Sequence, residues 1–116
     1  MYRGTTPTFT LQLNSDLDLT SMEQIWVTFK NKSAEVTYEK DDVTIDAENC
    51  TITVHMSQED SLKFQTCGVL QGKVELQVRL LDNQGIASAS NIAEVDLLRI
   101  LKDGVIEAQE EVVNNG

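Results

Sequence analysis

Hydrophobic and polar residues alternate along most of this chain. The clearest run lies between Gly72 and Asp82, where the apolar residues Val74, Leu76, Val78 and Leu80 are separated by Glu75, Gln77 and Arg79. A period of two is typical of a β-strand with one dry face and one polar face. We therefore predict an all-β protein that is organised around this strand.

The same period predicts the other strands and the faces that their side chains occupy. They are expected at residues 8–13, 22–30, 35–39, 43–45, 51–56, 86–90 and 91–97. The connections are too short for parallel crossovers, which favours antiparallel pairing. In the second run Ile25, Val27 and Phe29 share one face, so Trp26 is predicted on the polar face. Trp26 either covers a neighbouring strand or loop or forms an exposed aromatic anchor at an interface.

One helical turn and an acidic tail complete the prediction. Residues 57–60 begin with a serine and carry an acid three residues later, which is typical of a helix N-terminus. Residues 95–104 are interpreted as a strand that runs into one helical turn stopped by Gly104, with a helix throughout as the alternative. We predict a single domain over residues 1–104. Residues 105–116 form an acidic tail that is expected to fray unless a partner orders it.

The charge of the chain argues against some classes of partner. The formal net charge of −10 on 116 residues disfavours nucleic acid, because phosphate binding depends on lysine and arginine. The acidity either keeps the protein soluble or meets a basic partner. No apolar run is as long as a membrane helix, and the first residues lack the pattern of a signal peptide. Synthesis in the cytoplasm is therefore expected.

Motifs for catalysis, cofactors or metals are not found in the sequence. His55, the single histidine, is predicted on a polar strand face with no nucleophile beside it in sequence. Cys50 and Cys67 are interpreted as buried free thiols, with a disulfide between them as the alternative. Asn14, Asp16 and Asp18 resemble the start of a calcium loop, but the glycine and glutamate that must follow are missing. We predict a protein that is not an enzyme and needs no cofactor or metal.

Several stretches resemble a known group of proteins. They are residues 2–8 (Tyr-Arg-Gly-Thr-Thr-Pro-Thr), 25–29 (Ile-Trp-Val-Thr-Phe), 57–64 (Ser-Gln-Glu-Asp-Ser-Leu-Lys-Phe) and 72–78 (Gly-Lys-Val-Glu-Leu-Gln-Val), followed by Gly85 and Ser90-Asn91. Together they resemble small phage and prophage structural proteins of Gram-positive bacteria and, more distantly, the immunoglobulin-like N-terminal domain of phage baseplate upper proteins. The resemblance implies an Ig-like antiparallel β-sandwich, and about seven short strands in a hundred residues agree with that architecture.

The resemblance also implies a role. It predicts a non-enzymatic virion or tail component, associated with the baseplate, that forms homo-oligomers and contacts other tail or baseplate proteins. Edge strands and the N-terminal arm 1–6 are the expected contact surfaces. The candidate interface residues are Tyr2, Arg3, Trp26 and Tyr38. The alternative is a carbohydrate-binding module for a cell-surface glycan, in which Trp26, Tyr2 or Tyr38 would supply the aromatic platform.

Overall fold

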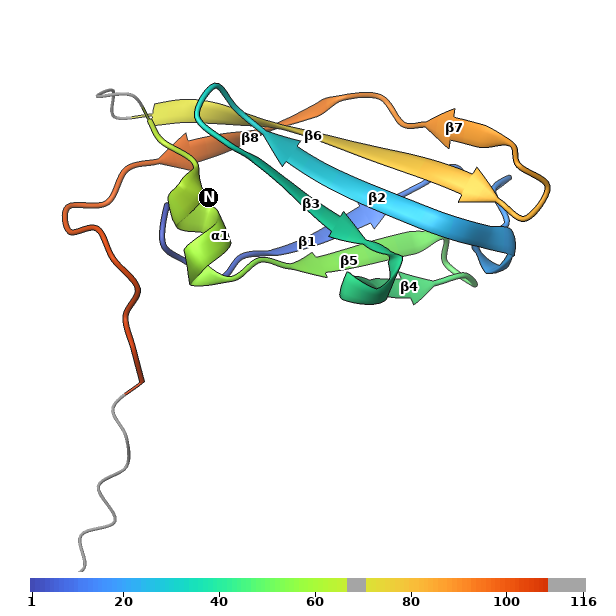
Figure 1. The fold of residues 1–116 in the computed structure, drawn as a ribbon, viewed down its shortest axis with the longest axis horizontal. Helices are drawn as coiled ribbons and strands as arrows, with labels where there is room; N and C mark the ends of the chain where they lie inside the picture. The colour runs from blue at the N-terminus through green and yellow to red at the C-terminus, as the bar shows by residue number, and fades with distance from the viewer. Residues whose placement is uncertain (67–70, 109–116) are drawn as a thin grey trace, which may run out of the picture.

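The chain folds into two antiparallel sheets and one short helix in the computed structural model, which describes residues 1–66 and 71–108 (Figure 1). The strands are β1 (Thr8–Gln12), β2 (Met22–Lys30), β3 (Glu35–Glu39), β4 (Thr44–Asp46), β5 (Thr51–His55), β6 (Gln71–Asp82), β7 (Ala87–Ala89) and β8 (Ala93–Leu98), the helix is α1 (Gln58–Lys63), and two 3-10 turns cover Leu19–Ser21 and Lys40–Asp42. The prediction of a mostly β protein with one helical turn is confirmed.

The long strand β6 lies inside the larger sheet. That sheet has the order β3-β2-β6-β7, and β8 continues the same side of β6 beyond β7. The smaller sheet has the order β1-β5-β4. Only β2–β3, β4–β5 and β6–β7 are pairs of consecutive strands among these ladders, because β1 pairs with β5 and β2 pairs with β6. The sequence pattern predicted the strands, but these long-range pairings needed the structure.

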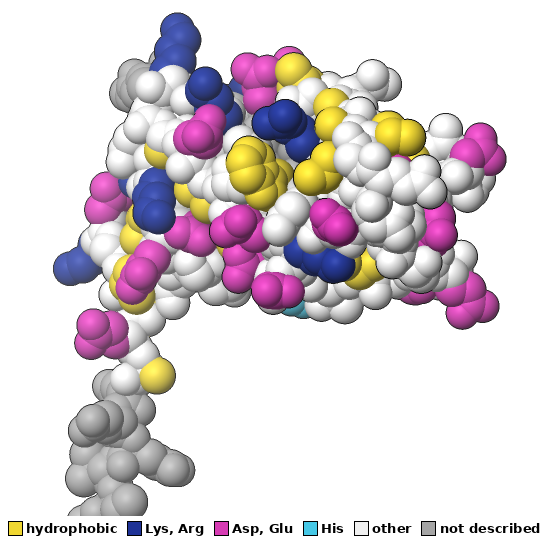
Figure 2. Space-filling model, turned by 45° about the vertical axis from the view of Figure 1, so that its right-hand side comes forward, with side chains coloured by type: hydrophobic (Ala, Val, Ile, Leu, Met, Phe, Trp, Pro, Cys, Tyr) yellow, Lys and Arg dark blue, Asp and Glu magenta, His cyan; other side chains and the backbone are white. Residues whose placement is uncertain are grey.

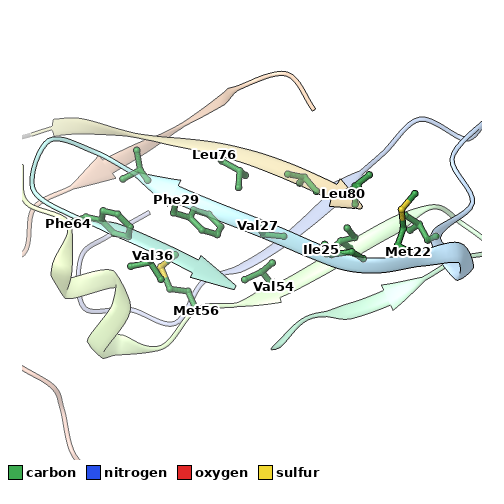
Figure 3. Close-up of a cluster of buried hydrophobic side chains, with 14 of the residues drawn as sticks. Met22, Ile25, Val27, Phe29, Val36, Val54, Met56, Phe64, Leu76 and Leu80 are labelled. Carbon is green, nitrogen blue, oxygen red and sulfur yellow. The ribbon is translucent and has the colours of Figure 1, made fainter. Parts of the chain in front are cut away.

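The dry faces of the two sheets meet in one core, as a β-sandwich requires (Figure 3). From β2, the side chains of Ile25, Val27 and Phe29 are fully buried, as the alternation predicted. The other buried hydrophobic residues are Leu19, Met22, Val36, Cys50, Ile52, Val54, Met56, Phe64, Val74, Leu76, Val78, Leu80 and Leu97. The polar faces of both sheets are therefore left for solvent or for partners.

Two turns and the start of the helix have local causes in the sequence. In the β2–β3 hairpin, the side-chain oxygen of Asn31 accepts hydrogen bonds from the backbone N–H groups of Ser33 and Ala34. Gly85 has a φ of +80° in the β6–β7 turn, a conformation that glycine adopts without strain. The hydroxyl of Ser57 caps α1 by accepting from the N–H of Asp60 at 3.1 Å.

The predicted helical turn before Gly104 is wrong. The chain stays extended to Leu98 at the end of β8 and then bends without forming a helix. The cause is a pair of backbone hydrogen bonds, in which the N–H of Leu98 donates to the carbonyl of Met1 and the N–H of Arg3 donates to the carbonyl of Leu98. The N-terminal arm thus forms a parallel bridge to β8, with Tyr2 opposite Leu98. This bridge uses the backbone groups that a helix would have needed.

Candidate functional site

The polar face of the larger sheet presents one large aromatic side chain. Trp26 is 43 % exposed and lies directly opposite Arg79 in the β2–β6 ladder. The guanidinium carbon of Arg79 lies 5.6 Å from the centre of the Trp26 ring, in the range of a cation–π contact. The indole is therefore partly exposed on the surface of the sheet, with the guanidinium of Arg79 from the neighbouring strand beside it. The sequence placed Trp26 on this side, and that part of the prediction is confirmed.

Two shallow hollows flank this tryptophan. The first is lined by polar and charged residues together with Ile92, and the second is lined mainly by apolar atoms. We call the residues of both hollows the outer face: Gln24, Trp26, Thr28, Lys30, Glu35, Thr37, Glu75, Leu76, Gln77, Arg79, Leu80, Leu81, Ala87 and Ile92. Figure 2 shows a face of the molecule on which hydrophobic side chains gather, with basic and acidic side chains among them. This combination of an aromatic centre and a polar surround is typical of a binding surface.

Tyr38, a second predicted interface residue, lies on the opposite side of the larger sheet. Its ring packs edge-on against Phe29 with the ring centres 5.9 Å apart, and its hydroxyl donates to the carboxylate of Asp60 at 2.6 Å. Burial, aided by the hydrogen bond to Asp60, raises the pKa of Tyr38. Burial also opposes ionisation of Asp60, but hydrogen bonds from Tyr38 and Lys63 outweigh it and hold the pKa of Asp60 below its usual value. Tyr38 thus joins β3 to α1.

Arg3, a third predicted interface residue, is only 5 % exposed. Its guanidinium donates to the carbonyl oxygens of Phe64 at 2.5 Å and Leu62 at 2.8 Å, and it forms an ion pair with Asp103 at 2.5 Å. These contacts tie the N-terminal arm to the end of α1 and to the segment after β8. Arg3 consequently has little surface left for a partner, whereas the neighbouring Tyr2 is 55 % exposed.

His55 and Cys50 are the remaining candidates that the structure describes. Nδ1 of His55 lies 2.9 Å from the hydroxyl of Thr8, on an exposed strand face. The buried thiol of Cys50 donates to the carbonyl of Asn14 at 3.1 Å. Cys67 lies outside the described residues, so the prediction that its thiol is free stays a prediction. Within residues 1–66 and 71–108, no three His, Cys, Asp or Glu side chains are grouped to hold a metal ion.

Arg79 is a candidate site residue that the sequence analysis left unassigned. The alternating pattern placed Arg79 on a polar strand face, but its contact with Trp26 depends on the register between β2 and β6. A one-residue shift in that register would have put a different pair opposite each other. The sequence pattern predicts the face of each side chain but not the partner across the ladder.

Comparisons with protein-family models, curated proteins and solved structures found no match to this chain. In the part of the chain that the structure describes, no helix has the length and apolar character needed to cross a membrane.

Proposed function

We propose that this protein is a non-enzymatic phage or prophage structural protein that assembles into the virion tail, next to the baseplate, through protein–protein contacts. The observation that carries the proposal is Trp26, a large aromatic side chain that is 43 % exposed between the two hollows of the outer face. Tryptophan and arginine are the residues most enriched among interface hot spots, and here Trp26 and Arg79 stand side by side. The partners are other copies of the chain and neighbouring tail or baseplate proteins.

The strand order supports an immunoglobulin-like fold for this role. The smaller sheet, β1-β5-β4, corresponds to an Ig B-E-D sheet, and β3-β2-β6-β7 corresponds to C′-C-F-G. The parallel bridge between the N-terminal arm and β8 then takes the place of a first strand that adds to the last one. Ig-like sandwiches serve many unrelated functions, so the strand order supports the fold and the outer face supports the contact role.

The experiment tests whether the chain is present in purified phage tails. The intact chain and its Trp26→Ala variant are expressed during induction of the phage or prophage that encodes them, and purified tails are labelled with an antibody against the chain. The intact chain should label the tails and scatter light as an oligomer, and the variant should lose most of the labelling. Thr44→Ala, an exposed change on the smaller sheet, serves as the control and should label normally. A monomeric chain that is missing from the particles refutes the proposal.

A second candidate function is glycan binding, because Trp26 stands beside a hollow lined by Glu35, Glu75 and Gln77. An aromatic platform next to polar side chains suits a sugar ring, although Arg79 already lies over one face of the indole. A glycan array with the intact chain and with Trp26→Ala tests this idea. Signals that disappear in the variant would support it, and an array without signals would eliminate it.

A further inference from the structure

The sandwich has an open groove between the edge strands β1 and β7. It is lined by Thr10, Leu11, Gln12, Leu13, Asn14, Leu17, Leu76, Val78, Leu80, Ser88, Ala89, Ser90, Asn91 and Ala93. All of these residues are uncharged, although a quarter of the chain is charged. The floor is apolar, because Leu76, Val78 and Leu80 of β6 belong to the core and are almost fully buried. The groove is therefore an apolar slot bordered by two strands.

The main-chain groups of β1 on this side have no partner in the described residues. Leu13 donates its N–H to Cys50 and Pro7 accepts from Met56, so the odd-numbered residues of β1 bond to β5. Backbone groups alternate in direction along an antiparallel strand. The N–H and C=O groups of Thr10 and Gln12 consequently point away from β5, toward the open edge.

The facing edge on β7 has the same character. Ser90 donates its N–H to Val78 and Asp82 donates its N–H to Ile86, so the even-numbered residues bond to β6. The backbone groups of Ala87 and Ala89 therefore point outward. The N-terminal arm bonds to this side of the sheet at the far end of β8, through the backbone of Leu98 and the carbonyl of Asp96, while β7 remains exposed.

The other two sheet edges are protected in the usual way. Charged side chains on an edge strand discourage pairing with another chain. The edge strand β3 carries Glu35 and Glu39, and the edge strand β4 carries Asp46. In contrast, the sequences of β1 (Thr-Phe-Thr-Leu-Gln) and β7 (Ala-Ser-Ala) contain no charge. The unprotected edges are thus the two that border the apolar groove.

Charge indicates what kind of segment occupies this slot. Asp16 and Asp18 flank Leu17, which lines the groove, and the chain as a whole has a net charge of −10. A second copy of the chain would bring another net charge of −10 toward the same region. A segment with basic ends is instead attracted to this acidic chain and to Asp16 and Asp18 beside the groove, while its uncharged middle suits the lining.

We propose that the groove accepts an extended segment of another protein as an added β-strand. This segment has apolar side chains at alternate positions, lacks acidic residues and is flanked by lysine or arginine. Its backbone pairs with Thr10 and Gln12 or with Ala87 and Ala89, and its apolar side chains cover the floor formed by β6. The groove is a second binding surface beside the outer face around Trp26. The two share only Leu76 and Leu80 of β6, and neither Trp26 nor Arg79 lines the groove.

The test uses the full chain and a synthetic peptide in which valine and threonine alternate, with two lysines at each end. NMR spectra of the ¹⁵N-labelled chain are recorded with increasing peptide. Binding with a dissociation constant below about 1 mM is expected. The amide signals of Thr10, Gln12, Ala87 and Ala89 should shift the most, and the amides of the paired edge should become protected from hydrogen exchange. A peptide with prolines at the threonine positions should not bind, because it lacks the donors.

One exposed residue on each of two edge strands provides matched variants. Ser88 of β7 lies opposite the buried Leu80 and faces the groove, whereas Thr44 lies on β4 of the smaller sheet and is not part of the groove lining. Both are exposed, so a lysine at either position should leave the fold intact. Ser88→Lys should weaken peptide binding by at least about tenfold, and Thr44→Lys should not.

Three results would overturn the proposal. The first is a spectrum that does not change at about 1 mM peptide. The second is a set of shifts centred on Trp26 and Arg79, which would assign the peptide to the outer face. The third is concentration-dependent shifts of the groove signals without peptide, which would identify the occupant as a second copy. Loss of tail labelling in Trp26→Ala with normal peptide binding would separate the groove from the proposed assembly contact.

Discussion

The hydroxyl of Tyr38 donates a 2.6 Å hydrogen bond to the carboxylate of Asp60 and so links β3 of the larger sheet to α1. The helix has only six residues, and its position depends on such tertiary contacts because so short a helix is unstable alone. The buried Phe64, which follows it, is a second attachment point.

We expect this link to make stability depend on pH at both ends of the scale. The pKa of Asp60 is lowered on folding, so its contribution is complete above an unfolded value of about 4 and is lost as the pH falls through the folded pKa. The pKa of Tyr38 is raised, so its contribution is complete below an unfolded value of about 10 and is lost as the pH rises. Tyr38→Phe should cost about 1 kcal/mol at neutral pH and flatten the alkaline limb.

Urea unfolding across the pH range measures both effects, and NMR titration of Asp60 measures its pKa directly. In Tyr38→Phe the pKa of Asp60 should rise because one donor is lost. Thr37→Ala, on the other face of β3, is the control. An unchanged pKa of Asp60 in the Tyr38 variant would contradict the assigned hydrogen bond.

Replacement of Arg3 should destabilise the protein more than most other substitutions in the N-terminal arm. Arg3→Met removes the donors to the carbonyls of Phe64 and Leu62 and should cost about 2 to 3 kcal/mol. Arg3→Lys should restore only part of this, because an ammonium cannot reproduce the planar fork of donors. Asp103→Asn tests the exposed end of the same network and should cost less than about 1 kcal/mol. Equal losses in Arg3→Met and Asp103→Asn, measured by urea unfolding, would contradict this order.

Two of the glycines with positive φ, Gly4 and Gly85, should differ in their response to alanine. Gly4 has a φ of +70°, and an added Cβ would lie 3.1 Å from side-chain atoms of both Leu62 and Ile100. Gly85 has a φ of +80° with no atom within 4 Å of such a Cβ. Gly85→Ala should therefore cost only the strain of the left-handed conformation, about 1 kcal/mol. Gly4→Ala should cost more in thermal unfolding, and a smaller loss than in Gly85→Ala would show that the arm repacks freely.

The single tryptophan makes the outer face directly observable. In Arg79→Gln the Trp26 ring loses its cationic neighbour, so its emission should be quenched more readily by acrylamide. The unfolding free energy should fall by no more than about 1 kcal/mol, the size expected for an exposed cation–π contact. Lys30→Gln, a change at the end of β2, is the matched loss of charge and should leave the emission unaltered. Identical quenching in the intact chain and in Arg79→Gln would refute the contact.

The sequence predicted burial best for strands that have one buried face and one solvent-exposed face. Alternation predicted the buried side of β2 and β6, and with it the exposure of Trp26. It could not predict that β1 pairs with β5, because the pattern records burial and not the partner strand. The groove was missed for the same reason, since it is formed by edges that are far apart in sequence.

Charged residues misled the sequence analysis at the two ends of the domain. Arg3 looked like part of a polar arm, yet it is buried because three acceptors from distant segments surround it. The residues after Leu98 combine apolar and charged positions in a helix-like order, but the arm holds Leu98 extended. Tertiary hydrogen bonds overrode the local preference in both cases.

The parallel bridge of the N-terminal arm has a mechanical consequence. Residues 1–3 run in the same direction as the end of β8, and the backbone bonds at Leu98 join the two segments. A force that pulled the first and last described segments in opposite directions would load these bonds together, in shear, along with the Arg3–Asp103 ion pair. Bonds loaded in shear must break at once, whereas the β6–β7 hairpin could open one bond at a time. The N-terminal arm should therefore make the two sheets resist being pulled apart by force applied at the ends of the described chain.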